Sequence, residues 1–253
     1  MRFKHFLPIL ALLLLYSCKK EKPALYKIEG KKIEISDSLP EKLEITSFIK
    51  PYKEHINKDL DSVISYAVDT YSKSDGELNT AIGNLFADAV YEQANPIFNS
   101  RTQKNIDMVL LNHGGIRAII SKGNITKRTA YEIMPFENSL VVVALQGKYV
   151  LEAVKYLQSA KRAHPIAKLQ IVLDSQYNLK KASINNHPIA PEKTYYVATN
   201  DYLYNGGDHM DFFKSSDTVY VLNYKVRNAL LDYFLKKDTI NPKIDSRFIK
   251  LNP

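Results

Sequence analysis

The sequence has few of the residues from which reactive centres are usually built. It contains one cysteine in 253 residues, so no disulfide can form within the chain. Its six histidines are dispersed, and none belongs to an Asp-x-His or Asn-His-Asp cluster of the kind that holds two metal ions. A Gly-x-Ser-x-Gly elbow and a Walker-type phosphate loop are also missing. We therefore predict no catalytic residue and no metal ligand in this chain.

The apolar run at residues 6–15 is too short to span a bilayer, and two basic residues precede it, which is the pattern of a signal peptide. It ends in Leu-Tyr-Ser-Cys at residues 15–18, which resembles a bacterial lipobox. We predict that residues 1–18 are a lipoprotein signal peptide and that Cys18 carries the lipid. An incidental cysteine behind an ordinary export signal is the alternative.

Residues 19–44 begin with a polar, basic stretch containing a proline, which is typical of a tether, and the folded domain is predicted over residues 45–253. The expected location is the surface of a bacterial membrane, facing the periplasm, with the lipid as anchor. The net charge of +8 is spread along the chain, so a basic surface is favoured over nucleic-acid binding.

Hydrophobic spacing predicts several helices. Apolar residues recur every three or four positions between residues 38 and 71, which indicates an amphipathic packing helix that begins after Pro51. A second helix covers residues 78–94, with Asn79 or Thr80 as its cap and Gly83 placed for close packing or ligand access. Further helices are predicted over residues 148–160 and 222–237.

Short apolar runs predict the strands. Residues 106–112 read as a strand buried on both faces, and further strands are predicted over residues 139–147, 167–175, 181–189 and 194–203. Residues 169–186 have the pattern of a hairpin. Strands alternate with helices, but a hairpin is also present, so we predict an α+β fold with a mixed sheet flanked by helices.

Three stretches carry polar or aromatic residues beside turns. In "NHGGIR", residues 112–117, glycines after a buried strand permit positive φ, so that backbone N–H groups and Arg117 face an anion. In "DYLYNGGDHMDFF", residues 201–213, Asp208 follows a Gly-Gly turn and can accept from vicinal hydroxyls. The alternatives are a solvated or ion-paired Arg117, and an Asp208 that caps local backbone. In "MPFENSL", Phe136 is either a flat platform or a core residue.

Together these stretches resemble the C-terminal domain of the 5'-nucleotidase family. The resemblance rests on "IGNLFADA" (82–89), "NHGGIR" (112–117), "PFENSLVVVALQG" (135–147) and "YNGGDHM" (204–210), in the family's order, and covers roughly residues 45–240. In that family this domain determines substrate specificity. The resemblance implies that the substrate-binding residues are Asn112, Arg117, Phe136, Tyr202 and Asp208.

The resemblance also implies a role for each of these residues. Arg117 would contact the nucleotide phosphate, and Asn112 would line the pocket. Phe136 and Tyr202 would stack on the two faces of the base, Tyr202 standing where the family usually has a second Phe, and Asp208 would hold the ribose hydroxyls. The sequence departs from the family before Gly83, where the usual arginines are missing from residues 72–85 and the only possible cation is Lys73.

Two more departures are His113 and His209, which stand where the family commonly has small residues. Both are interpreted as residues of surface turns, and the alternative is a pH-sensitive polar contact. Family enzymes hydrolyse phosphate esters with two metal ions in a separate metallophosphatase domain. That domain is missing from this sequence, so the metal pair, the only cofactor implied, is expected on a partner.

Three hypotheses follow. The first is the specificity subunit of a split 5'-nucleotidase that works with a separately encoded metallophosphatase. The second is a stand-alone nucleoside- or nucleotide-binding lipoprotein without catalysis. The third is an interaction module that has kept the fold and lost the pocket.

Overall fold

The computed structural model describes residues 24–36 and 38–252. The predicted signal peptide and Cys18 lie outside these residues. Contacts divide the chain at residue 49, and the larger unit, which begins at Lys50, contains all of the strands described. In the described part of the chain, no helix combines the length and apolar character needed to cross a membrane. The domain boundaries drawn from the sequence stay a prediction.

The first helix differs from its prediction. α2 spans Leu43–Leu60 with Pro51 inside it, and none of its residues is buried. A proline removes one helical hydrogen bond without having to end the helix. The apolar positions beyond α2 belong instead to strand β1, Val63–Ala67, and its flank. The prediction of a packing helix after Pro51 is therefore wrong, because helical spacing marks an apolar stripe but does not supply an element to cover it.

A mixed five-stranded sheet forms the centre of the larger unit, as predicted. Strand β9 pairs in parallel with β2, and the other pairings are antiparallel. Across the sheet the strands are β10 (Thr218–Lys225), β4 (Ser139–Gln146), β9 (Thr194–Asn200), β2 (Met108–Leu110) and β5 (Ile166–Ala167).

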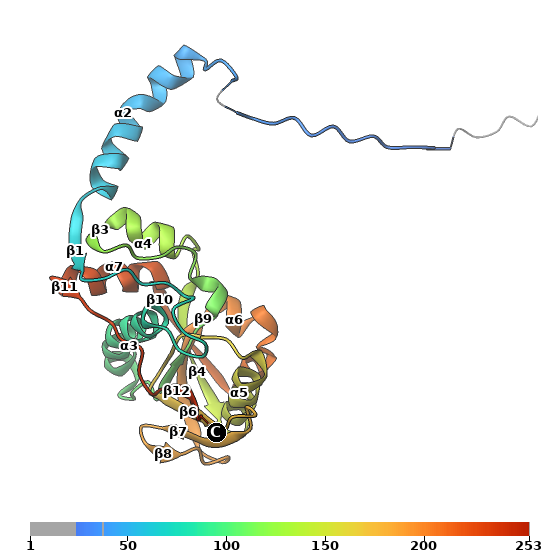
Figure 1. Cartoon of the computed structure of the whole chain (residues 1–253), viewed down its shortest axis with the longest axis vertical. Coiled ribbons are helices and arrows are strands. Elements are labelled where there is room, and N and C mark those ends of the chain that lie inside the picture. The colour runs from blue at the N-terminus through green and yellow to red at the C-terminus, as the bar shows by residue number, and fades with distance from the viewer. Residues whose placement is uncertain (1–23, 37, 253) are drawn as a thin grey trace, which may run out of the picture. The chain divides into compact units, whose positions relative to one another are not determined.

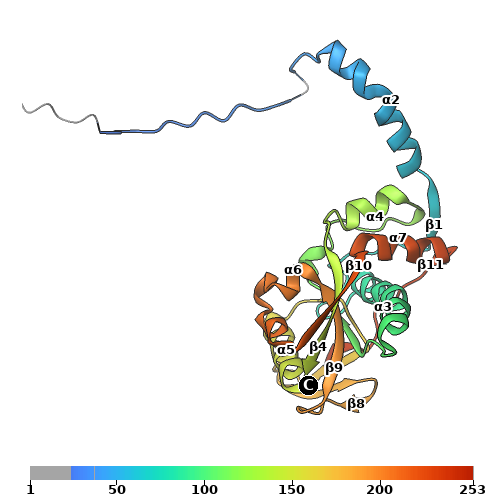
Figure 2. The same ribbon diagram turned by 180° about the vertical axis from the view of Figure 1, so that it is seen from behind.

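Helices cover both faces of this sheet (Figures 1 and 2). One face carries α3 (Ala81–Thr102) and α7 (Val226–Lys236), and the other carries α5 (Gly147–Ala160). Along β4, Val142 packs with α3 and α7, whereas Val143 packs with α5. Each fully buried valine contributes about 1.5–3 kcal/mol of transfer free energy. Two covered faces explain why the central strands are continuous apolar runs.

Two smaller sheets lie beside the central one. The predicted hairpin is confirmed, because β6 (Leu169–Leu173) pairs antiparallel with β7 (Leu179–Ile184). Strands β12 (Phe248–Lys250) and β8 (His187–Pro188) complete that four-stranded sheet. The third sheet joins β1 to β11 (Thr239–Ile240) and β3 (Gly123–Thr126), and α4 (Lys127–Ile133) follows β3.

Helix α3 begins at a side-chain cap. The hydroxyl of Thr80 accepts from the amide of Gly83 at 3.2 Å, so Thr80 rather than Asn79 is the cap. A Cβ at Gly83 would lie 2.9 Å from that hydroxyl and 3.9 Å from the backbone of Ala163 and of Pro165. Gly83 therefore serves close packing at the start of α3, and not access for a ligand. The closing helix is also shorter than predicted, since residues 222–225 belong to β10.

The strand order brings three of the motifs to one edge of the sheet. Because β2 and β9 are parallel neighbours, the segments after Leu110 and Asn200 leave the sheet on the same side. β4 runs antiparallel to β9, with Leu140 opposite Asn200, so the "PFEN" segment before β4 enters at that edge too. Stretches that are distant in sequence thus meet because of strand direction.

Candidate functional site

All five residues predicted to bind substrate line one cavity of about 320 Å³ at this edge. The lining consists of Asn112, Gly114, Gly115, Arg117, Met134, Phe136, Asn138, Asn200, Tyr202 and Asp208. The structure therefore brings together side chains from three separate segments. Their part in binding stays a prediction.

Two aromatic rings stand at the cavity with much of their surface in water. Phe136 is 41% exposed and Tyr202 is 45% exposed, so neither is a core residue. Phe136 lies in the loop before β4, and Tyr202 lies in the short helix α6, Asp201–Tyr204. Large apolar rings that line a cavity and stay exposed offer flat faces to a ligand.

Arg117 is exposed, and its guanidinium carbon lies 5.8 Å from the centre of the Phe136 ring. Among the described residues, no carboxylate lies within ion-pair distance of it. The structure therefore does not support the alternative in which Arg117 is ion-paired. The guanidinium can meet an anionic group at the cavity without breaking an ion pair.

The first glycine pair differs from its prediction. Gly114 and Gly115 do not have positive φ, and they belong to a 3-10 turn, His113–Gly115. A Cβ at Gly115 would come within 3.0 Å of the side-chain oxygen of Asn112. Gly115 is therefore needed so that Asn112 can lie close against the backbone, and not for a left-handed conformation.

The amides of this turn are mostly used inside the protein. Gly115 donates to Asn112 at 3.0 Å, and Arg117 donates to Ile133 at 2.8 Å. Ile116 donates to the carbonyl of His113, whose own amide donates to the ring of His164. Those four N–H groups do not face a ligand, so the predicted backbone anion site is not formed by them.

The second glycine turn does use left-handed backbone. Gly206 has φ +89°, and Asp208 and His209 follow with φ of 51° and 60°. Each non-glycine residue in this region costs about 1–2 kcal/mol. A Cβ at Gly207 would lie 2.5 Å from the ring of Tyr202. The turn therefore both aims the Asp208 side chain and leaves room for the tyrosine ring.

Asp208 and Tyr202 form a pair. The Tyr202 hydroxyl donates to Oδ1 of Asp208 at 2.9 Å, and this bond is the main cause that raises the pKa of Tyr202 above its ordinary value. The hydroxyl also accepts from the Asp208 amide at 3.3 Å. Tyr202 thus holds the carboxylate in place, while the second carboxylate oxygen has no hydrogen bond within the described residues and can accept one from a ligand.

Two asparagines at the cavity were not predicted from the sequence. The amide of Asn138 donates to Asp201 at 3.3 Å, and the side chain of Asn200 accepts from the amide of Leu203 at 2.8 Å as the cap of α6. Asn138 lies within the "MPFENSL" stretch, two residues after Phe136, whereas Asn200 lies just before the "DYLYNGGDHMDFF" stretch, two residues before Tyr202. Their hydrogen bonds fix the two segments that carry the rings.

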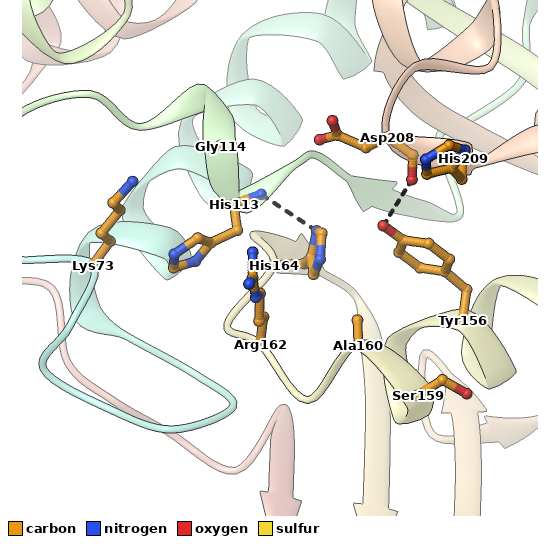
Figure 3. A pocket seen from close by; sticks show the side chains of 10 residues that line it. All are labelled: Lys73, His113, Gly114, Tyr156, Ser159, Ala160, Arg162, His164, Asp208 and His209. Atoms are coloured by element: carbon orange, nitrogen blue, oxygen red, sulfur yellow. Dashed lines mark hydrogen bonds between the residues drawn. The ribbon is translucent and has the colours of Figure 1, made fainter.

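A larger cavity of about 750 Å³ lies beside the first and shares Gly114 and Asp208 with it (Figure 3). Lys73 lines this second cavity and not the first. His113 is half-buried, with Nδ1 at 3.0 Å from the carbonyl of Ala163, so it is more than a residue of a surface turn. His209 is exposed, in agreement with its interpretation.

His164 is a buried imidazole in the wall of the larger cavity. It is 6% exposed, and burial is the main cause that lowers its pKa to about 4. Its Nδ1 lies 3.3 Å from both the amide nitrogen of His113 and the carbonyl oxygen of Leu111, and its Nε2 has no hydrogen-bond partner among the described residues. Sequence reasoning gave no signal for this residue, because "AHPIA" resembles none of the motifs.

Within residues 24–36 and 38–252, no group of three or more histidine, cysteine, aspartate or glutamate side chains is placed to hold a metal ion. The expectation that the metal pair belongs to a partner stays a prediction.

The sequence model of the 5'-nucleotidase C-terminal domain matches residues 60–215, which is more than half of the chain. The chain belongs to this family. An apyrase of Tabanus yao is 25% identical over 230 residues, which are 83% of this chain and 42% of that protein. A cell wall protein of Listeria monocytogenes is 30% identical over 178 residues, which are 64% of this chain and 22% of that protein.

A solved structure supports the family's fold. The 5'-nucleotidase precursor of Thermus thermophilus aligns with a TM-score of 0.69 at 24% identity, over 85% of this chain and 44% of that one. The chain thus spans less than half of the length of these relatives. The predicted family assignment and fold class are confirmed. The stretch that matches the family model, residues 60–215, includes every residue that lines the smaller cavity.

The buried His164 predicts a pH-dependent stability. The unfolded chain binds a proton at this imidazole below about pH 6.5, but the folded chain does so only below about pH 4. Lowering the pH from 7 to 5 therefore favours the unfolded state, by ~2 kcal/mol at pH 5. Urea unfolding of the wild type and of His164→Gln at both pH values measures this effect. Equal losses of stability in the two proteins contradict it.

Proposed function

We propose that this chain is the nucleotide-binding part of a split 5'-nucleotidase, which acts with a separate metallophosphatase. The observation that carries the proposal is the single cavity lined by two exposed rings, an unpaired arginine and an aspartate. Membership of the 5'-nucleotidase C-terminal domain family supports it. The metal pair and the hydrolytic step would belong to the partner, in which two metals clamp the phosphoryl oxygens and supply the hydroxide.

Each residue has a role that its surroundings suit. Phe136 and Tyr202 would hold the base by stacking, which is worth ~1–3 kcal/mol per base. Asp208 would accept from the two ribose hydroxyls, Arg117 would meet the phosphate, and Asn112 would offer a polar contact in the lining. A hydrogen bond to a charged partner contributes about 1.5–3 kcal/mol, so Asp208 is the strongest single test.

Asp208→Asn is expected to weaken adenosine binding by about tenfold or more and to abolish the preference for adenosine over 2'-deoxyadenosine. Asparagine tolerates the left-handed backbone at this position, so the fold is retained. Calorimetric titration of the purified chain without metal gives both affinities. Asp217→Asn, an exposed carboxylate outside the cavity, is the control.

Two further variants in the same titration separate stacking from the ribose contact. Phe136→Leu should weaken both nucleosides equally, because it removes a ring and no polar group. Gly207→Ala should weaken both nucleosides and also reduce the preference for adenosine, since its Cβ displaces the Tyr202 ring, whose hydroxyl holds Asp208. If no common nucleoside or nucleotide produces heat with the wild type, the chain is not a nucleotide-binding protein.

The alternative is a stand-alone nucleoside- or nucleotide-binding lipoprotein. It is favoured by the small cavity itself, in whose lining Arg117 is the only cationic side chain. A pocket with one exposed arginine gains less from a phosphate than a family pocket with two or three.

Reconstitution separates the two functions. Mixing the purified chain with the metallophosphatase of the same organism and a divalent metal should raise the rate of nucleotide hydrolysis above that of the partner alone. The increase should disappear with Phe136→Leu, because the base is then not held. Unchanged hydrolysis, together with intact nucleoside binding, would favour the stand-alone protein.

We also propose that the chain is exported and held at a bacterial membrane by a lipid on Cys18. The Leu-Tyr-Ser-Cys sequence supports lipidation, and a relative described as a cell wall protein supports export. Cys18→Ser should move the protein from the membrane fraction to the soluble fraction of the producing bacterium and stop the incorporation of labelled palmitate. A wild-type protein that incorporates no label would exclude the anchor.

A further inference from the structure

The loop that carries Phe136 has no regular secondary structure of its own. It spans residues 134–138, between the end of α4 and the start of β4, and Met134, Phe136 and Asn138 all line the smaller cavity. Within the described part of the chain, the exposed Phe136 ring belongs to no aromatic pair. The place of this ring at the cavity therefore depends on what holds the backbone of the loop.

The junction of β10 and α7 holds the second half of this loop. Lys225 donates from Nζ to the carbonyl of Glu137 at 2.6 Å and to the hydroxyl of Ser139 at 3.0 Å. The amide of Val226 donates to the carbonyl of Asn138 at 3.0 Å. Two consecutive residues thus bind three consecutive residues of the segment that leads into β4.

The next residue, Arg227, holds the part of the loop that carries the ring. It is 7% exposed, and its Nη1 donates to the carbonyls of Met134 and Phe136, both at 3.5 Å. Its Nη2 donates to the carboxylate of Glu137, and its guanidinium carbon lies 4.2 Å from the centre of the Tyr131 ring in α4. One buried side chain therefore binds the loop on both sides of Phe136 and ties it to α4.

This set of contacts suits a guanidinium. Its planar fork carries five N–H donors and a flat face, so it can meet two carbonyls, a carboxylate and a ring at once, whereas a lysine offers a single point charge. The hydrogen bond from Arg227 is the main cause that lowers the pKa of Glu137 below its ordinary value, so the ion pair is formed at neutral pH. The Glu137 side chain is 68% exposed, so the pair is open to water on that side.

We propose that Arg227 is the positioning residue that sets the Phe136 ring for stacking on the base. Arg227 does not line the smaller cavity and lies beyond residues 60–215, the stretch that matches the family model. It acts on a ligand only through Phe136. The stacking role rests on the proposed nucleotide-binding function, whereas the fixing of the ring rests on the contacts of the loop alone.

The position of the ring is measured first without a ligand, by fluorine NMR of the whole chain labelled with para-fluorophenylalanine. The resonance that disappears in Phe136→Leu belongs to Phe136. Arg227→Met should shift or broaden that resonance and leave those of the buried core phenylalanines in place, because only the loop loses its contacts. Methionine keeps an apolar stem beside Tyr131, and the exposed Glu137 is not left as a buried charge, so the fold is retained.

Calorimetric titration then measures the effect on binding. Arg227→Met should weaken adenosine and 2'-deoxyadenosine equally, by about fivefold or more, because a displaced ring loses much of its stacking while Asp208 still binds the ribose. In a chain that already carries Phe136→Leu, Arg227→Met should have no further effect on affinity, because the ring through which it acts is missing. A general loss of structure would instead weaken binding in both backgrounds.

Two more variants complete the design. Arg227→Lys keeps the positive charge beside Glu137 and loses the fork, so it should change the Phe136 resonance and the affinity in the same direction as Arg227→Met. The control is Arg101→Met, which removes a guanidinium that also donates to two backbone carbonyls, those of residues 221 and 222, outside the smaller cavity. It should leave both the resonance and the affinity unchanged.

The outcomes separate this inference from the proposed function. A changed Phe136 resonance in Arg227→Met, without any nucleoside or nucleotide binding by the wild type, upholds the fixing of the ring and refutes the proposed function. An unchanged resonance in both Arg227 variants refutes the inference, and so does an equal loss of affinity with and without the Phe136 ring. The same changes in Arg101→Met would also refute it, because the effect would then not be specific to the loop.

Discussion

The parallel pairing of β9 with β2, inside a sheet covered on both faces, places the segments that line the smaller cavity. Parallel neighbours end at the same edge, so the two glycine turns must leave the sheet together. Antiparallel β4 then brings Phe136 to that edge from the opposite direction. Burial of apolar side chains on both faces keeps these strands in register, because a shift of one residue would exchange the two cores.

The shape of the smaller cavity depends on a glycine that leaves room for a ring and on a strained backbone at Asp208. Gly207 leaves room for the Tyr202 ring, and Asp208 adopts left-handed backbone so that its carboxylate meets the tyrosine hydroxyl. Strain of this kind persists where the surroundings over-determine the conformation, and here the hydroxyl of Tyr156 donates to the backbone carbonyl of Asp208 while the hydroxyl of Tyr202 donates to its carboxylate. The Asp208 carboxylate is thus held in a fixed position in which a ligand can bind it.

Charge is divided between the two cavities. Arg117 lines the smaller one and Lys73 and Arg162 line the larger, whereas Asp208 lines both. The cations come from loops far apart in sequence, so no basic cluster is visible along the chain. The fold therefore brings three cations that are far apart in sequence to two neighbouring cavities.

Strands β2, β4 and β9, helices α3 and α5, the hairpin and the family could be predicted from the sequence, and the resemblance to the family indicated five of the residues that line the smaller cavity, whereas β10 and β5 were not predicted. Those features depend on local apolar spacing and on contiguous motifs, which neighbouring residues specify. Only the tertiary structure decided that α2 has no buried residue, that Gly115 serves close approach, and that His164 and Arg162 reach the cavity wall. These features depend on contacts between segments that are distant in sequence. The residue spacing within one segment does not show which other segment packs against it.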